Sequence, residues 1–203
     1  MDASEVLLNA ALSLINTNQE LNLDEAKDII KKTTGFLSPE TRDSSYTRLR
    51  WDEYFMSLAF LVSMRSPDSQ TQHGCVIVDK NNRVISTGYN GWVHGANDES
   101  MPNLRPKKYL HVIHSEVNAV LSAYQNLSGC TAYITGAPCN ECLKVMAQSG
   151  IKDIVIGDRS HVFATEYIEL QSFICASHDI KIRKFIGKLA TLDGREITQE
   201  SHK

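Results

Sequence analysis

From residue 51 onward, the chain alternates between segments with helical spacing of apolar residues and short segments that are almost wholly apolar. Residues 51–64 have a wide apolar stripe at helical spacing, which predicts an amphipathic helix. Residues 75–78 are continuously apolar, and the polar turn at 79–82 separates them from a second strand at 83–87. The chain therefore begins its main part with a helix followed by a hairpin.

The same alternation continues to residue 185. Further helices are expected at 111–124, 141–149 and 164–176, and further strands at 131–135, 152–157 and 180–185. Strands separated by single helices need crossover connections, which place them parallel in a shared sheet. The pattern predicts an α/β domain at residues 46–187.

The two ends of the chain have weaker patterns. Residues 6–15 and 24–32 each have one apolar face at helical spacing, and Gly35 follows the second as a stop signal. These faces are too small to be stable alone, so residues 1–45 are expected to form a helical extension that packs on the domain or on a neighbouring subunit. Residues 188–203 are polar and are expected to be a frayed tail.

Composition narrows the class of protein. Hydrophobic residues make up 42% of the chain and charged residues 22%, which is ordinary for a globular protein, and no apolar run approaches the roughly 20 residues of a membrane helix. The formal net charge of −3, without a basic stripe, argues against a nucleic-acid partner. Cys75, Cys130 and Cys175 lie in apolar surroundings and are expected to be free thiols, which fits a cytoplasmic protein.

The candidate chemistry lies in two short motifs, His114-Ser115-Glu116 and Pro138-Cys139-Asn140-Glu141-Cys142. One imidazole and two thiols are ligands that Zn²⁺ prefers, and a nearby carboxylate can move protons. His-x-Glu with Pro-Cys-x-x-Cys is the signature of zinc deaminases, in which the Glu is the general acid and base. We expect one catalytic Zn²⁺ held by His114, Cys139 and Cys142, with Glu116 as the catalytic residue.

Two neighbouring features bear on this site. His111 lies one turn before His114 on the expected helix and is a rival ligand, although the signature favours His114. Gly88-Tyr89-Asn90-Gly91 predicts a loop with unusual backbone angles and close approach to another group, such as a ligand, although a plain turn fits as well. The connection then runs to about residue 108, and connections of this length are usually functional or mobile.

With these residues placed, residues 51–185 resemble the cytidine and deoxycytidylate deaminase superfamily, and more narrowly its dCMP deaminases. The resemblance rests on five motifs: Trp51–Met56, Gln72–Asp79, Gly88–Gly91, His114–Ala119 and Pro138–Cys142. It implies a cytidine-deaminase-like three-layer α/β/α sandwich with a five-stranded mixed sheet. It also implies hydrolytic deamination of dCMP to dUMP and ammonia, which feeds thymidylate synthesis.

The resemblance further implies roles for single residues. Asn90 would bond the sugar, and Ser115 and Ala137 would contact the substrate. The substrate phosphate needs cationic donors, for which Arg65, Arg105 and Lys108 are the candidates. Relatives are often homo-oligomers, either hexamers or dimers, that dCTP activates and dTTP inhibits, with Mg²⁺ as a possible companion of the triphosphate. The effector residues would be Gly88, Tyr89, Gly91 and Trp92.

Three departures from the usual family pattern leave alternatives open. Ser115 replaces the usual Ala, Trp92 and Val93 follow the Gly-Tyr-Asn-Gly motif where a Pro is common, and residues 158–161 lack the usual aromatic beside the base. The alternative substrates are dCTP, a C5-modified deoxycytidylate, or a tRNA or single strand, the last of which would need a basic groove. A zinc scaffold without activity would need a fourth protein ligand.

Overall fold

The computed structural model describes residues 48–159, 165–192 and 195–196. The chain divides into two compact units, Met1–Arg48 and Leu49–Lys203, and the described residues belong almost wholly to the second. The helices expected at 6–15 and 24–32 lie outside the described residues. In the described part, no helix is both long enough and apolar enough to cross a membrane.

The second unit contains one five-stranded sheet in the order β2-β1-β3-β4-β5. Its strands are β1 (Gly74–Val78), β2 (Val84–Tyr89), β3 (Thr131–Ile134), β4 (Asp153–Ile156) and β5 (Lys181–Lys184). The β1 strand pairs antiparallel with β2 and β3, while β3, β4 and β5 are parallel. The mixed sheet and its parallel half are confirmed.

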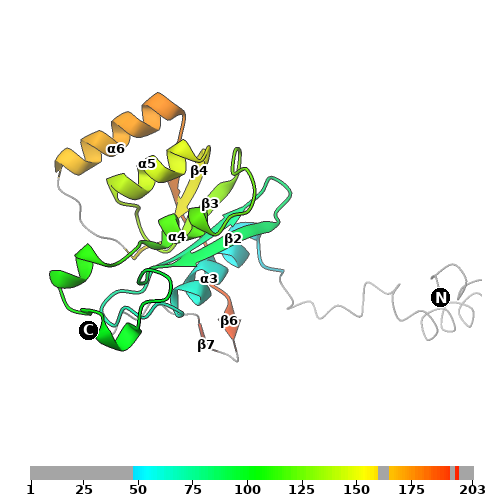
Figure 1. Cartoon of the computed structure of the whole chain (residues 1–203). Coiled ribbons are helices and arrows are strands. Elements are labelled where there is room, and N and C mark those ends of the chain that lie inside the picture. Colours follow the sequence, from blue (N-terminus) through cyan, green and yellow to red (C-terminus); the bar gives the residue numbers. More distant parts are fainter. Residues whose placement is uncertain (1–47, 160–164, 193–194, 197–203) are drawn as a thin grey trace, which may run out of the picture. The chain divides into compact units, whose positions relative to one another are not determined.

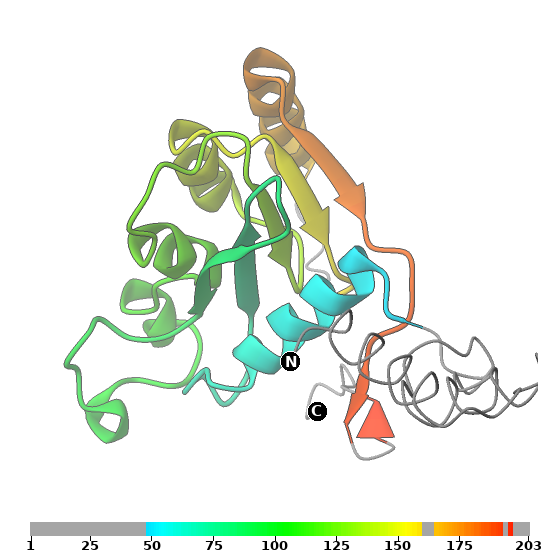
Figure 2. The same cartoon turned by 90° about the vertical axis from the view of Figure 1, so that its right-hand side faces the viewer.

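Helices cover both faces of this sheet (Figures 1 and 2). One face packs against α3 (Trp51–Ser63), and the other packs against α4 (Ser115–Leu121), α5 (Asn140–Gln148) and α6 (Thr165–His178). Side chains of β1 alternate between the two apolar layers: Cys75 and Ile77 face the α4–α5–α6 side, whereas Val76 and Val78 face α3. The expected three-layer sandwich is confirmed.

The helix expected at 111–124 is shorter than predicted, because the backbone before it is held in another conformation. A 3₁₀ turn, η3 (Lys107–Leu110), comes first, and Ile113 then forms a β-bridge with Gly91 through hydrogen bonds of 2.8 and 3.0 Å. The helix starts only at Ser115. The exposed His111 therefore lies outside it, and the helical spacing that made His111 a rival ligand is wrong.

The start of the C-terminal segment is ordered against α3, so the expectation of a frayed tail from residue 188 is wrong as far as the described residues go. The backbone N–H of Ala190 donates to Ser57 Oγ at 2.8 Å, and Leu189 packs against the apolar layer beneath α3. Two short strands follow, β6 (Thr191–Leu192) and β7 (Arg195–Glu196). The apolar contact of Leu189 and the hydrogen bond of Ala190 together hold the start of this mostly polar segment against α3.

Candidate active site

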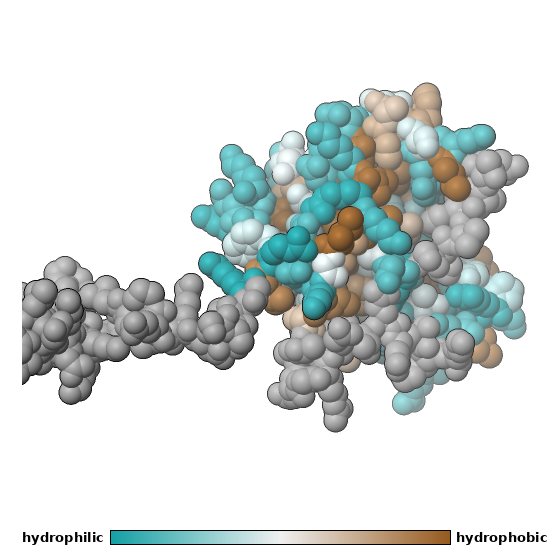
Figure 3. All heavy atoms as spheres, turned by 180° about the vertical axis from the view of Figure 1, so that it is seen from behind, coloured by the Kyte–Doolittle hydropathy of each residue, from teal (hydrophilic) through white to brown (hydrophobic). Residues whose placement is uncertain are grey.

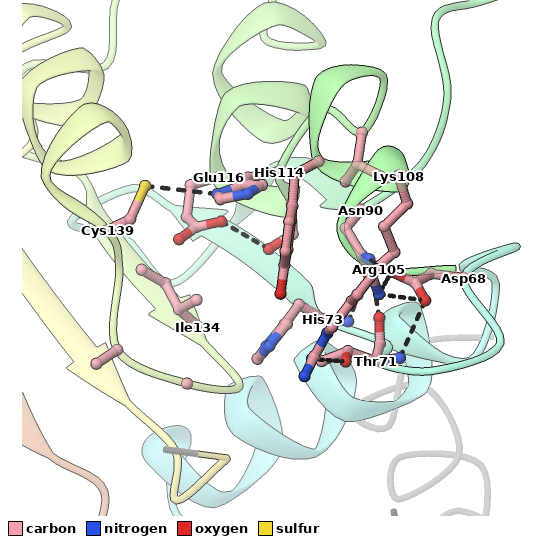
Figure 4. Close-up of a pocket in the computed structure, with 15 residues that line it drawn as sticks. Asp68, Thr71, His73, Asn90, Arg105, Lys108, His114, Glu116, Ile134 and Cys139 are labelled. Atoms are coloured by element: carbon pink, nitrogen blue, oxygen red, sulfur yellow. Dashed lines mark hydrogen bonds and ion pairs between the residues drawn. The ribbon is translucent and has the colours of Figure 1, made fainter. Parts of the chain in front are cut away.

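Two of the three expected metal ligands occupy equivalent positions on two helices. His114 is the N-cap of α4, and Cys139 is the N-cap of α5. Both have extended backbone angles, with φ/ψ of −72°/155° and −73°/168°, and Cys142 lies in the first turn of α5. Because both helices begin at the same place in the fold, their N-terminal ends bring the three side chains together. Figure 4 shows two of them, His114 and Cys139, side by side.

The spacing of these side chains fits a zinc ion. His114 Nδ1 lies 3.5 Å from Cys139 Sγ and 3.3 Å from Cys142 Sγ. With Zn–S of about 2.3 Å and Zn–N of about 2.0 Å, a tetrahedral ion separates an N and an S ligand by about 3.5 Å. Among the described residues, these three form the group whose donor atoms lie within 4.8 Å of one another. No fourth His, Cys, Asp or Glu of the described residues joins this group. A zinc ion held by these three residues would therefore have a position left for water, as hydrolytic sites require.

The two sulfurs also influence each other's ionisation. A hydrogen bond from Cys142 lowers the pKa of Cys139 to about 4, and the contact with His114 acts in the same direction. The same contact with Cys139, together with burial, raises the pKa of Cys142. One thiolate is therefore favoured by the protein alone, and a divalent cation favours the second.

Glu116 lies beside this cluster in the first turn of α4 and is 5% exposed. Ser115 Oγ donates a hydrogen bond of 2.9 Å to Glu116 Oε2. Burial raises the pKa of the Glu116 carboxyl, and the hydrogen bonds it accepts from its own backbone and from Ser115 act against this rise. A buried carboxyl with a raised pKa, next to a metal cluster, is suited to accepting and returning a proton.

The metal cluster and Glu116 face a cavity of about 450 Å³. Figure 4 shows the metal-binding side chains on one side of it and a polar group on the other, made of Asp68, Thr71, Asn90, Arg105 and Lys108. This volume lies in the range of small-molecule sites, which are usually about 300–1,000 Å³. The cavity therefore has the room that a nucleotide needs.

The structure brings three predicted substrate residues to this cavity: Asn90, Ser115 and Ala137 all line it. The side chain of Asn90 is 4% exposed and already bonded within the protein. Its Oδ1 accepts from the backbone N–H of His73 at 2.6 Å, and its Nδ2 donates to Thr71 O at 2.9 Å and to Asp68 Oδ2 at 3.3 Å.

The three predicted phosphate-binding cations have different surroundings. Arg105 lines the cavity, is exposed, and donates to Thr71 Oγ1 at 3.0 Å. Lys108 also lines the cavity, but it is buried in an ion pair with Asp68 at 2.7 Å. Arg65 instead lines a second hollow, so its expected place beside the substrate is not what the structure shows.

The second hollow has a volume of about 570 Å³ and lies beside the β2–α4 contact, since residues of both elements line it. It is lined by all four of the expected effector residues: Gly88, Tyr89, Gly91 and Trp92. The indole Nε1 of Trp92 is buried without a hydrogen-bond partner within the described part of the chain. Buried polar groups normally have partners, so this N–H can donate to a bound molecule.

The expectation of unusual backbone angles at Gly88 and Gly91 is wrong, although the expected close approach is found. Strand β2 continues through Tyr89, and within the described residues the glycines with positive φ are Gly95, Gly129 and Gly150. A Cβ at position 88 would lie 2.3 Å from the backbone N of Ala119 and from Ser115 O. Glycine is needed at position 88 because α4 packs directly on the strand.

Sequence reasoning missed several cavity residues, among them Asp68, Thr71 and His73. Residues 66–69 have the composition of a turn after the helix predicted at 51–64, and such a turn by itself does not indicate a binding site. The available signal was an acidic residue in the turn that leads into a wholly buried strand. Residues 158–161 lack the aromatic that relatives usually have beside the base, and Arg159 of this segment instead makes contacts within the protein. Its guanidinium lies 5.1 Å from the centre of the Phe60 ring and donates to Gln72 O.

The comparisons with known proteins agree with this geometry. Residues 49–158 match the family described as "Cytidine and deoxycytidylate deaminase zinc-binding region". The human protein "Deoxycytidylate deaminase" is 34% identical over 152 residues, which cover 71% of this chain and 84% of the relative. The mouse protein of the same description is 39% identical over 121 residues, which cover 56% of this chain and 68% of the relative.

Solved structures show the same fold. The apo dCMP deaminase from the cyanophage S-TIM5 has a TM-score of 0.53 at 24% identity, covering 68% of this chain and 100% of that one. Its complex with dCMP and dUMP has a TM-score of 0.51 at 22% identity, covering 69% of this chain and 100% of that one. Together with the sequence match over residues 49–158, these results show that the chain belongs to the cytidine and deoxycytidylate deaminase family.

Proposed function

We propose that this deaminase converts dCMP and water into dUMP and ammonia. The observation that carries the proposal is the buried Glu116 facing a cavity of about 450 Å³ beside the His114–Cys139–Cys142 cluster. Sequence identity of 34–39% to deoxycytidylate deaminases supports dCMP in particular. A structural metal site has no use for a proton carrier, so the pairing of a cluster with a buried acid favours catalysis.

Glu116 performs the proton transfers of the reaction. A zinc ion at the cluster supplies a water whose pKa is lowered to about 7. Glu116 accepts a proton from the attacking water and passes it to N3 of the cytosine. It then takes the proton of the new hydroxyl on C4 and gives it to the amino group, which leaves as ammonia while C4 becomes a carbonyl. Ser115 Oγ holds one carboxylate oxygen of Glu116, which leaves the other oxygen to meet the base.

For the substrate phosphate, Arg105 is the strongest of the three candidate cations. It is exposed at the cavity, and its guanidinium lies 5.8 Å from the centre of the Tyr109 ring, which steadies it at that position. Lys108 is paired with Asp68, and Arg65 lies at the other hollow. An exposed guanidinium can bind a phosphate by two parallel hydrogen bonds.

The direct test is ammonia release by the zinc-loaded protein from cytidine, dCMP, dCTP, 5-methyl-dCMP and dAMP. We expect dCMP to have the highest kcat/KM, and Arg105→Met to lower that value for dCMP while leaving deoxycytidine almost unchanged. Faster turnover of dCTP or of 5-methyl-dCMP would reassign the substrate. Release from dAMP alone would contradict a cytosine deaminase.

We also propose that nucleoside triphosphates regulate the enzyme from the second hollow, with dCTP as activator and dTTP as inhibitor. The unpartnered Trp92 N–H and the cation of Arg65, both at this hollow, support a ligand with acceptor atoms and negative charge. Trp92→Phe removes the N–H together with part of the indole ring, so it should weaken the response to dCTP while dCMP turnover without effector stays the same. An unchanged dCTP response would remove Trp92 from the site.

The assembly and the compartment are further parts of the proposal. Exposed apolar side chains on and near α4, at Val93, Leu110, Leu121 and Tyr124, support a homo-oligomer, either a hexamer or a dimer. The opposite view shows further apolar areas between hydrophilic ones (Figure 3). All five cysteines are free, which supports a reducing compartment such as the cytoplasm. Light scattering at several protein concentrations measures the oligomer size.

A further inference from the structure

Asp68 is the centre of a buried polar network beside the metal cavity. Its carboxylate and the Lys108 ammonium are both 2% exposed, with N–O distances of 2.7 and 2.9 Å. The same carboxylate accepts backbone N–H bonds from Gln70 and Thr71, and a bond from Asn90 Nδ2. Figure 4 shows Lys108 pointing into this network. The network links the turn after α3, the end of β2, and the long connection before α4.

The network fixes which way the Asn90 amide faces. Its Nδ2 has two hydrogens, and both are used on groups that only accept, the Asp68 carboxylate and the Thr71 carbonyl. Its Oδ1 accepts the backbone N–H of His73. A flipped amide would place Oδ1 against a carboxylate and a carbonyl, and Nδ2 against an N–H. Only one acceptor lone pair of Asn90 is therefore left for a ligand in the cavity that it lines.

We propose that Asp68 and Lys108 are positioning residues that make Asn90 an acceptor, and never a donor, toward the substrate. This inference rests on the proposed dCMP deaminase activity. The sugar of dCMP carries one hydroxyl, on C3′, and a hydroxyl can donate to the free lone pair of Asn90 Oδ1. The ion pair thereby selects a nucleotide with this hydroxyl. Lys108 also anchors the connection that carries Arg105 and Tyr109 to the cavity.

Three substrates separate this role from its alternatives: dCMP, 2′,3′-dideoxycytidine 5′-monophosphate, which lacks the 3′-hydroxyl, and deoxycytidine, which lacks the phosphate. The measured quantity is the ratio of kcat/KM between two substrates in the same protein preparation. This ratio does not depend on the fraction of folded, zinc-loaded enzyme. A purely structural effect of a variant lowers all three activities together and leaves the ratios unchanged.

Wild-type enzyme should prefer dCMP over the dideoxy nucleotide by roughly 10- to 100-fold, the worth of one well-placed hydrogen bond. In the single variants Asp68→Asn and Lys108→Met, the preference for dCMP over the dideoxy nucleotide should fall to within about threefold, mainly through a higher KM for dCMP. The preference for dCMP over deoxycytidine should stay near that of wild type. The control is Lys144→Met, which breaks an exposed ion pair of the same 2.7 Å length with Glu141 and should change neither ratio.

Other outcomes overturn the proposal. A wild-type enzyme that does not discriminate against the dideoxy nucleotide, or variants that keep the wild-type ratio, would remove the positioning role while leaving dCMP deamination intact. If Lys108→Met loses the preference over deoxycytidine instead, Lys108 is a phosphate ligand. If the single variants do not fold, the double variant Asp68→Asn/Lys108→Met leaves no buried charge unpaired and must show the same loss of ratio. Absence of dCMP turnover in wild type would refute the proposed function and this inference with it.

Discussion

His114 and Cys139 occupy helix positions that usually carry a capping side chain. N-cap positions favour Ser, Thr, Asp and Asn, whose side chains bond the free N–H groups of the first turn, and replacing such a cap by Ala costs about 1 kcal/mol. Neither His114 nor Cys139 makes a side-chain cap. At both positions the side chain is turned toward the metal cluster instead. The free N–H groups of both helices point toward the same region and favour negative charge there, as on a thiolate.

A substitution at Glu116 tests its role as the proton carrier. Glu116→Gln keeps the size of the side chain and its place beside Ser115, but an amide cannot carry the proton. We expect kcat for dCMP to fall by roughly 10²–10⁴-fold, the usual contribution of a general acid–base group, with zinc content unchanged. Ammonia release and metal analysis on the same sample measure both quantities.

The matched control for Glu116→Gln is Glu141→Gln. Glu141 lies in the first turn of α5 as Glu116 lies in the first turn of α4, but its side chain is 80% exposed. This variant should retain both zinc and turnover. Retained dCMP deamination in zinc-loaded Glu116→Gln would refute the assigned role.

At the scale of elements, the contact of α4 with β2 sets the place of the metal cluster. At Gly88 a Cβ would meet the backbone of Ser115 and Ala119 at 2.3 Å, so Gly88→Ala must push α4 away from the strand. We expect a loss of about 1–3 kcal/mol in the free energy of unfolding, as in overpacked cores, and weaker zinc binding. Urea unfolding and zinc titration measure these effects.

Gly91 in the same motif provides the comparison. A Cβ there would meet only side-chain atoms of Pro67 and Tyr89, at 3.5 Å, which is ordinary contact, and its φ is not positive. Gly91→Ala should therefore leave both stability and zinc binding near wild type. Equal losses in the two variants would mean that close packing on α4 is not what position 88 requires.

A second pair of elements, α3 and β5, is joined through Asp52. Arg183 of β5 forms two hydrogen bonds of 2.7 Å with the Asp52 carboxylate, and Tyr133 of β3 donates a third at 2.8 Å. The hydrogen bond from Arg183 is the main cause that lowers the pKa of Asp52 below its usual 3.8. The charged carboxylate therefore stabilises the fold above pH 3.8, and this stabilisation is lost as pH falls through the lower folded-state pKa.

Asp52→Asn should accordingly destabilise the protein near neutral pH and have little effect under strongly acidic conditions. The Arg183 side chain is 52% exposed and the Asp52 side chain 31% exposed, so solvent screening limits the effect to about 0.5–1 kcal/mol. Urea unfolding at pH 7 and at about pH 3 gives the difference between variant and wild type at each pH. The control is Asp153→Asn at an exposed position of β4. A constant difference at both pH values would show that ionisation of Asp52 is not responsible.

The sequence predicted those elements whose signal is contained within a few residues. The stripe of α3, the buried strand β1 and the two metal motifs are local patterns, and the structure contains them as expected. Long-range contacts carry no such signal. The start of α4 depends on the bridge between Gly91 and Ile113, and the polar wall of the cavity depends on the pairing of Asp68 with Lys108, 40 residues later.

Across the whole molecule, helix α4 connects the two hollows, because it contributes residues to the lining of both. Helix α4 carries Glu116 toward the metal cavity and Asn118 toward the second hollow. The Asn118 side chain donates to Tyr89 O at 2.8 Å and so joins α4 to the end of β2. A ligand that shifts this end of β2 therefore acts on the element that positions the catalytic carboxylate, which is the physical basis for the proposed regulation.

The last prediction concerns the part of the chain that the deaminase needs. Within the part of the chain that the structure describes, both apolar layers are built from residues after position 54, and Arg50 begins α3 by bonding Glu53 and Ile186 O. A protein of residues 46–203 should therefore fold, bind zinc and turn over dCMP at a rate near that of the full chain, because it keeps every described residue of the apolar layers and of the metal cavity. Thermal unfolding, metal analysis and kcat/KM on both proteins measure this, and light scattering shows whether residues 1–45 alter the assembly. A shortened protein that keeps its zinc but loses turnover would mean that residues 1–45 complete the site.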